Sequence, residues 1–235
     1  MKSEDQSKPA PGPKRKYLRF RNRPLHNIKL QVKENSPGLR LSNISMGGVG
    51  ILAEPKDDYK DEFSAILTIG NKRFDVHLIK VFRDSEIMGC RFEEINEDLG
   101  RCIDKYFQAE LMALNLNRVE TPSNRQEKTI FFHSQNNCEL LINERNGQIN
   151  YFSIIVLGNC LEIDAKGKLA IGQLIVDDKV PRRNGLLLFK SVETPETYIF
   201  EIAKRFVEAV KDLSPEYRKN LTAMMDNSMS KENIK

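Results

Sequence analysis

Two short segments of this chain hold the residue types best suited to binding chemistry. One is the glycine-rich run Asn43-Ile-Ser-Met-Gly-Gly-Val-Gly-Ile51, and the other is the basic run Lys14-Arg-Lys-Tyr-Leu-Arg-Phe-Arg-Asn-Arg23. Glycines permit positive φ and close backbone approach, and the N–H groups of such a turn can form an anion-binding concavity. The forked guanidinium of arginine matches phosphate oxygens and the guanine edge, and its flat face stacks on bases. The two segments together suit an anionic ligand that contains guanine.

The positive charge of the chain is concentrated near its N-terminus. Nine of the 37 Lys and Arg residues lie between Gln6 and Lys33, where there is no acidic residue. The other 28 share the rest of the chain with all 33 acidic residues, so the formal net charge is only +4. This distribution indicates a local anionic partner. Hydrophobic residues at 40% and charged residues at 30% are typical of a globular protein.

Several function classes lack the residues they need. Met1-Lys2 is followed by polar residues, and the densest apolar run, 151–157, is far shorter than the roughly 20 residues of a membrane span. We therefore expect a cytoplasmic protein with reduced thiols and no membrane span. No C-x-x-C or metal-ligand spacing predicts a metal or cofactor site among the cysteines and histidines, which are Cys90, Cys102, Cys138, Cys160, His26, His77 and His133.

Alternating apolar and polar residues dominate the first half of the chain. This pattern, with turn signals every eight to twelve residues, predicts a small antiparallel barrel or sandwich. A helix over 96–115 should follow, with Asn96 as its N-cap and an apolar face that packs on the sheet. The six predicted strands are 28–32, 39–44, 49–53, 63–69, 74–78 and 87–92.

The two chemical segments also resemble a known family. Arg15-Lys-Tyr-Leu-Arg19 matches R-x-x-x-R, and Asn43-Ile-Ser-Met-Gly-Gly48 matches [D/N]-x-S-x-x-G, beginning 24 residues after Arg19. This pair, on six short strands followed by a helix, resembles the PilZ domain, a bacterial receptor of cyclic di-GMP, over residues 14–115. The resemblance implies a six-stranded antiparallel PilZ-type β-barrel with a C-terminal helix.

The resemblance also implies roles for individual residues. Arg15 and Arg19 would clamp phosphates and guanine edges, and Asn43, Ser45 and Gly48 would line the opposite side of the guanine. Asn43 brings one acceptor oxygen where the family most often has a carboxylate. The run Arg19-Phe-Arg-Asn-Arg23 matches R-x-x-x-R as well, but the offset to the first strand favours Arg15 and Arg19. The residues to which we assign accessory roles are Lys14, Arg21, Arg23 and Gly47.

The second half of the chain predicts a separate α+β domain of unknown role. We place a disordered tail at 1–13, the barrel domain at 14–116, a polar linker at 117–128, the second domain at 129–225 and a polar tail at 226–235. Within the second domain, Asn146-Gly147 is a strong two-residue hairpin signal. Thr194-Pro195 and Ser214-Pro215 each predict a capped helix start. Strands come first and two helices last.

Three functions compete for this sequence. The leading one is a cyclic di-GMP receptor of bacterial second-messenger signalling, in which the ligand rearranges the basic N-terminal arm and the second domain passes the change to a protein partner. The second is a PilZ-fold adaptor with a degenerate nucleotide site. The third is a nucleic-acid binder that uses the basic arm, against which the absence of Trp and the small net charge count. No catalytic motif is found, and we expect no enzymatic activity.

Overall fold

The chain forms two compact units, and each is described here by itself. The computed structural model describes residues 17–21, 23, 26–34, 36–52, 59–121, 126–175, 189–192 and 197–232. Unit 1 comprises Met1–Lys105 and unit 2 comprises Tyr106–Lys235. The described residues are mainly β, with two seven-stranded antiparallel sheets and four helices.

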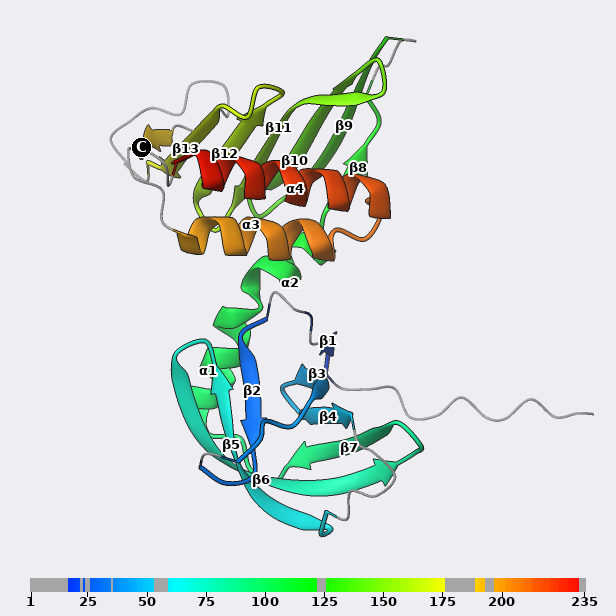
Figure 1. The fold of residues 1–235 in the computed structure, drawn as a ribbon, viewed down its shortest axis with the longest axis vertical. Helices are drawn as coiled ribbons and strands as arrows, with labels where there is room; N and C mark the ends of the chain where they lie inside the picture. The colour runs from blue at the N-terminus through cyan, green and yellow to red at the C-terminus, as the bar shows by residue number, and fades with distance from the viewer. Residues whose placement is uncertain are drawn as a thin grey trace, which may run out of the picture. The chain divides into compact units, whose positions relative to one another are not determined.

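Unit 1 is built on a curved sheet (Figure 1). Its strand order is β1-β3-β4-β7-β6-β5-β2, so strands distant in sequence become neighbours. An isolated antiparallel bridge between Leu30 and Leu39 ties the edge strand β2 to the residues that lead into β3. The strands are β1 (Phe20–Arg21), β2 (Ile28–Gln31), β3 (Leu41–Ser45), β4 (Gly48–Leu52), β5 (Glu62–Ile69), β6 (Lys72–Arg83) and β7 (Ile87–Phe92).

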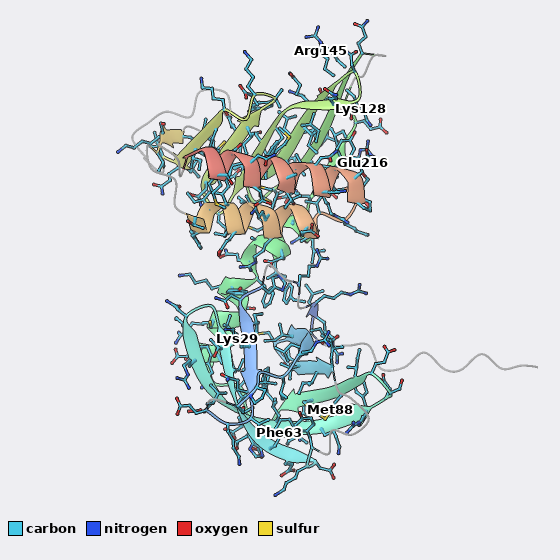
Figure 2. The ribbon with its side chains drawn as sticks, viewed as in Figure 1. Lys29, Phe63, Met88, Lys128, Arg145 and Glu216 are labelled. Atoms are coloured by element: carbon cyan, nitrogen blue, oxygen red, sulfur yellow. The ribbon has the colours of Figure 1, made fainter. Side chains whose placement is uncertain are left out.

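The core of unit 1 follows from the alternation of its strands. Successive side chains of a strand point to opposite faces, so every second residue enters the concave interior. Leu30, Leu67 and Leu78 are fully buried in this way. Met88 of β7 is also fully buried, whereas Lys29 of β2 is exposed (Figure 2). The apolar stripes of the sequence therefore become the inner wall of the sheet.

A helix, α1 (Glu97–Tyr106), follows the last strand of unit 1. The side-chain Oδ1 of Asn96 accepts a hydrogen bond from the backbone N–H of Leu99 at 2.8 Å, which is the N-cap expected from the sequence. Leu99 and Ile103 are buried, and they form the apolar face of the helix. The predicted single helix over 96–115 is in fact two helices, because Phe107 leaves helical geometry with φ −96° and ψ 10°.

Unit 2 is an antiparallel meander in which every described strand pairs with its neighbour in sequence. The Asn146-Gly147 hairpin is confirmed, since both residues have positive φ and connect paired strands. The strands are β8 (Asn117–Val119), β9 (Glu127–Ser134), β10 (Cys138–Arg145), β11 (Gln148–Val156), β12 (Asn159–Asp164), β13 (Leu169–Leu174) and β14 (Phe189–Ser191); the helices are α2 (Gln108–Leu114), α3 (Thr197–Ala209) and α4 (Pro215–Glu232).

The core of unit 2 lies between its sheet and its helices. Helices α3 and α4 run side by side across one face of the sheet (Figure 1). Phe132 and Phe152 enter this core from the strands, and Phe206 enters it from α3; all three are buried. No described helix is both long enough and apolar enough to cross a lipid bilayer.

The predicted fold class is wrong. A six-stranded PilZ-type barrel with a helix, followed by an α+β domain, does not describe this chain, because each unit holds a seven-stranded antiparallel sheet. The strand of unit 1 that was not predicted, β1, has only the two residues Phe20–Arg21 and lies inside the basic segment. Two residues are too few to produce a period-two pattern, so the sequence does not reveal this strand.

The boundaries also differ from those predicted. The compact units divide after Lys105, not after 116. Strand β8 lies inside the predicted 117–128 linker and pairs with β9. Helix α4 continues into the predicted 226–235 tail, where the buried Ser228 hydroxyl donates to the carbonyl oxygen of Gly167 at 3.3 Å. The end of α4 is polar in sequence, and the one residue of residues 226–230 that is buried, Ser228, is itself polar. The sequence of this part of the helix therefore looks like a polar tail.

Candidate functional site

A pocket of about 310 Å³ on unit 1 is the candidate site. It brings together residues from the N-terminal segment, the β3–β4 turn and the strands β6 and β7. Of the residues predicted to bind ligand, Arg19, Ser45, Gly47 and Gly48 line it. The full lining is Tyr17, Arg19, Ser45, Gly47, Gly48, Val81, Phe82, Gly89, Cys90 and Arg91.

The short strand β1 is what joins the two sequence motifs. Phe20 pairs with Ile44 in antiparallel register. Arg19 precedes Phe20 and Ser45 follows Ile44, so this pairing brings Arg19 alongside the glycine-rich turn. Two segments separated by more than 20 residues in the chain thus become adjacent on the same sheet.

The side chain of Ser45 holds the turn in shape. Its Oγ accepts a hydrogen bond from the backbone N–H of Gly47 at 3.2 Å and donates to the carbonyl oxygen of Gly48 at 3.3 Å. Ser45 is buried, so these bonds form away from bulk water. The hydroxyl therefore orients the turn, and the turn backbone borders the pocket.

Gly48 is required by the packing of β4 on β7. Its φ is +153°, and it pairs with Arg91 of β7. A Cβ at this position would overlap the carbonyl oxygen of Cys90 and lie 2.7 Å from the Cα of Arg91. Neither atom belongs to a movable side chain, so the clash can be relieved only by separating the strands.

Replacing Gly48 by alanine should therefore destabilise unit 1. We expect Gly48→Ala to lower its free energy of unfolding by about 1–3 kcal/mol, the usual cost of a strained backbone position. The measurement is amide hydrogen exchange in β4 and β7. Gly38→Ala is the matched control, because its Cβ would lie 3.8 Å from the carbonyl oxygen of Leu30, an ordinary contact. Equal exchange rates in the two variants would contradict this account of the turn.

Two aromatic rings of the pocket each lie against a glycine. A Cβ on Gly47 would be 2.8 Å from Cδ2 of Tyr17, and a Cβ on Gly89 would overlap the ring of Phe82. Tyr17 is 42% exposed and Phe82 is 43% exposed, so a large part of each ring still faces solvent. The missing glycine side chains thus provide space for the rings at the pocket wall.

The electrostatics of the pocket favour an anion. Arg19 and Arg91 are both exposed, and neither has an ion-pair partner in the described part of the chain. Cys90 is buried, and burial raises the pKa of its thiol to about 11, although the nearby Lys80 acts in the opposite direction. Because the thiol stays neutral at physiological pH, it does not offset the positive charge of the two arginines.

Asn43 does not line the pocket with the other predicted residues. It pairs with Arg21 on one side and Gly50 on the other. Its Nδ2 donates to Oγ of Ser42 at 3.1 Å, and its side chain packs over the bare Cα of Gly50. Arg21 and Arg23 also lie outside the lining. Lys14 and Arg15 lie outside the described residues.

The two sequence motifs do not include the part of the pocket wall that β6 and β7 form. Val81, Phe82, Gly89 and Arg91 line the pocket, and none of them belongs to the two motifs. One available signal was the neighbouring pair Val81-Phe82, because two large apolar residues in succession interrupt the alternation of a strand. Across the described residues, His, Cys, Asp and Glu side chains form no group of three that could hold a metal ion.

No protein-family model and no curated protein matches this chain. A crystal structure of an uncharacterized Legionella protein is similar to it, at 17% sequence identity and a TM-score of 0.31. The similarity covers 41% of this chain and 94% of the Legionella chain.

Proposed function

We propose that unit 1 binds cyclic di-GMP in this pocket and that the protein is a receptor of bacterial second-messenger signalling. The observation that carries the proposal is the convergence of Arg19 with Ser45, Gly47 and Gly48 on one pocket. These residues belong to the two motifs that resemble PilZ domains. The ligand would bind on the seven-stranded sheet of unit 1.

The chemistry of the pocket matches the two parts of such a ligand. The guanidinium groups of Arg19 and Arg91 can bind phosphate oxygens through paired hydrogen bonds. The exposed rings of Tyr17 and Phe82 offer flat apolar surface to a purine. At about 310 Å³ the pocket is at the lower end of the size range of small-molecule sites. It therefore suits one guanylyl half of the dinucleotide.

The bound state is relayed along the chain through the turn and α1. Met46, in the turn between Ser45 and Gly47, lies beside α1: its Cε would be 3.2 Å from a Cβ placed on Gly100. A ligand that repositions the turn therefore acts directly on the helix that ends at Tyr106. Unit 2 then presents the change to a protein partner, in this proposal.

Isothermal titration of the whole chain at physiological salt tests this function. We expect saturable binding of cyclic di-GMP and much weaker binding of GTP, which lacks the second guanine. The adaptor hypothesis predicts no heat of binding with any nucleotide. The nucleic-acid hypothesis predicts that duplex DNA binds in preference, with an affinity that falls steeply as salt is raised. Either of these last results removes the proposal.

A further inference from the structure

We infer that Phe82 is the stacking platform for one purine base of the bound ligand, an inference that rests on the proposed function. Phe82 lies on β6, far in sequence from both motifs, and it lines the pocket as a residue that is 43% exposed. Within the described part of the chain it makes no aromatic or cation–π contact. An apolar ring in this situation gains from a planar partner that covers it.

A β-bulge gives Phe82 its position. The register of β6 on β7 shifts between Lys80 and Phe82, so Val81 is the extra residue. Bulges re-aim the side chains that follow them and are enriched beside binding sites. After this bulge, Phe82 pairs with Gly89, and its ring lies over the bare Cα of that glycine. One part of the ring is thereby held against the β7 backbone, and the exposed part remains available.

The neighbouring charge supports the same assignment. Gly89 and Arg91 are two residues apart on β7, so they face the same side of the strand. Arg91 therefore lies on the strand face against which the Phe82 ring packs, and both residues line the pocket. A nucleotide whose base covers the ring can place its phosphate toward Arg91. In this arrangement the base stacks on Phe82 of β6, and the phosphate binds Arg91 of β7.

Stacking makes a distinct prediction for affinity. Stacking of a base on an aromatic ring contributes enough that its loss weakens binding about tenfold or more. We expect Phe82→Ala and Phe82→Leu to weaken cyclic di-GMP binding by about this factor, because leucine fills space without a flat ring. The salt dependence of binding should be unchanged, since stacking is not screened by ions. Ile95→Ala is the control, because Ile95 is 37% exposed and lies outside the pocket lining.

A tryptophan at the same position gives a direct spectroscopic readout. The chain contains no Trp, so Phe82→Trp introduces a single indole fluorophore. We expect it to bind cyclic di-GMP at least as tightly as the wild type, with a saturable change in indole fluorescence. Ile95→Trp provides the matched reporter outside the pocket and should not respond. Circular dichroism of each variant checks that the fold is retained.

The outcomes separate this inference from the proposed function. Weakened binding in Phe82→Ala and Phe82→Leu, with a fluorescence response confined to Phe82→Trp, supports the stacking role. If the wild type binds but all Phe82 variants keep its affinity and Phe82→Trp is silent, the stacking role is overturned while the receptor function stands. If the wild type does not bind cyclic di-GMP at all, both fail together.

Discussion

Arg19→Ala is expected to weaken cyclic di-GMP binding by about 10- to 100-fold and to leave the stability of unit 1 unchanged. A hydrogen bond to a charged group contributes about 1.5–3 kcal/mol, and each 1.4 kcal/mol is a tenfold change in affinity. Arg19 is exposed and has no ion-pair partner among the described residues, so its removal breaks no interaction that holds the fold. Isothermal titration measures the change.

Two further variants sharpen the test of Arg19. Arg19→Lys keeps the charge but loses the planar fork, so its affinity should lie between those of the wild type and Arg19→Ala. Arg40→Ala removes another exposed arginine of unit 1 that lies outside the pocket lining, and it should bind as the wild type does. Loss of Arg19 should also reduce the salt dependence of binding. Equal affinities for Arg19→Ala and Arg40→Ala would exclude Arg19 from the site.

The second large effect is expected at a buried ion pair in unit 2. Arg205 of α3 donates from Nε to Oε1 of Glu110 at 2.7 Å and from Nη2 to Oε2 at 2.9 Å. Nη2 also donates to the carbonyl oxygen of Tyr106, and the guanidinium lies 4.1 Å from the centroid of the Tyr106 ring. Both side chains of the ion pair are less than 10% exposed. The pair therefore fixes α2 against α3 with nearly all of its charge removed from water.

Arg205→Met should lower the free energy of unfolding of unit 2 by about 3–5 kcal/mol, because it leaves the Glu110 carboxylate buried without a partner. The measurement is amide hydrogen exchange in β10 and β11, which reports the opening of this unit. Arg145→Met is the control: Arg145 faces Glu127 at 3.9 Å with both side chains largely exposed, and such pairs contribute at most about 1 kcal/mol.

A double substitution separates the buried charge from lost packing. Arg205→Met combined with Glu110→Leu removes both charges, and it should recover most of the stability lost in Arg205→Met alone. If Arg205→Met costs no more than Arg145→Met, the ion pair does not hold unit 2 together. If the double variant is less stable than the single one, the loss arises from packing of the arginine stem.

Local patterns in the sequence account for much of each unit. The alternation in β5 and β6 around Gly70, and in β10 and β11 around Asn146-Gly147, predicts those hairpins because side-chain direction has a period of two and the turns need positive φ. The two motifs, taken together, also predict that Arg19 and the glycine-rich turn lie close together, and both line one pocket.

Other features depend on contacts that no local pattern records. The β6–β7 wall of the pocket depends on the strand order β4-β7-β6, which is set by how all the strands of the sheet pair. The Glu110–Arg205 pair joins residues 95 positions apart, and each reads alone as an ordinary charged residue on a helix. The packing of Asn43 over Gly50 likewise depends on the register of β3 against β4.

The most direct test of the receptor proposal is to map cyclic di-GMP onto isotope-labelled protein by NMR. The proposal predicts that the largest amide shifts occur at Arg19, Gly47, Gly48 and Arg91, and that they saturate together as ligand is added. Shifts that fall mainly on β8–β14, or no shifts at millimolar ligand, would contradict it.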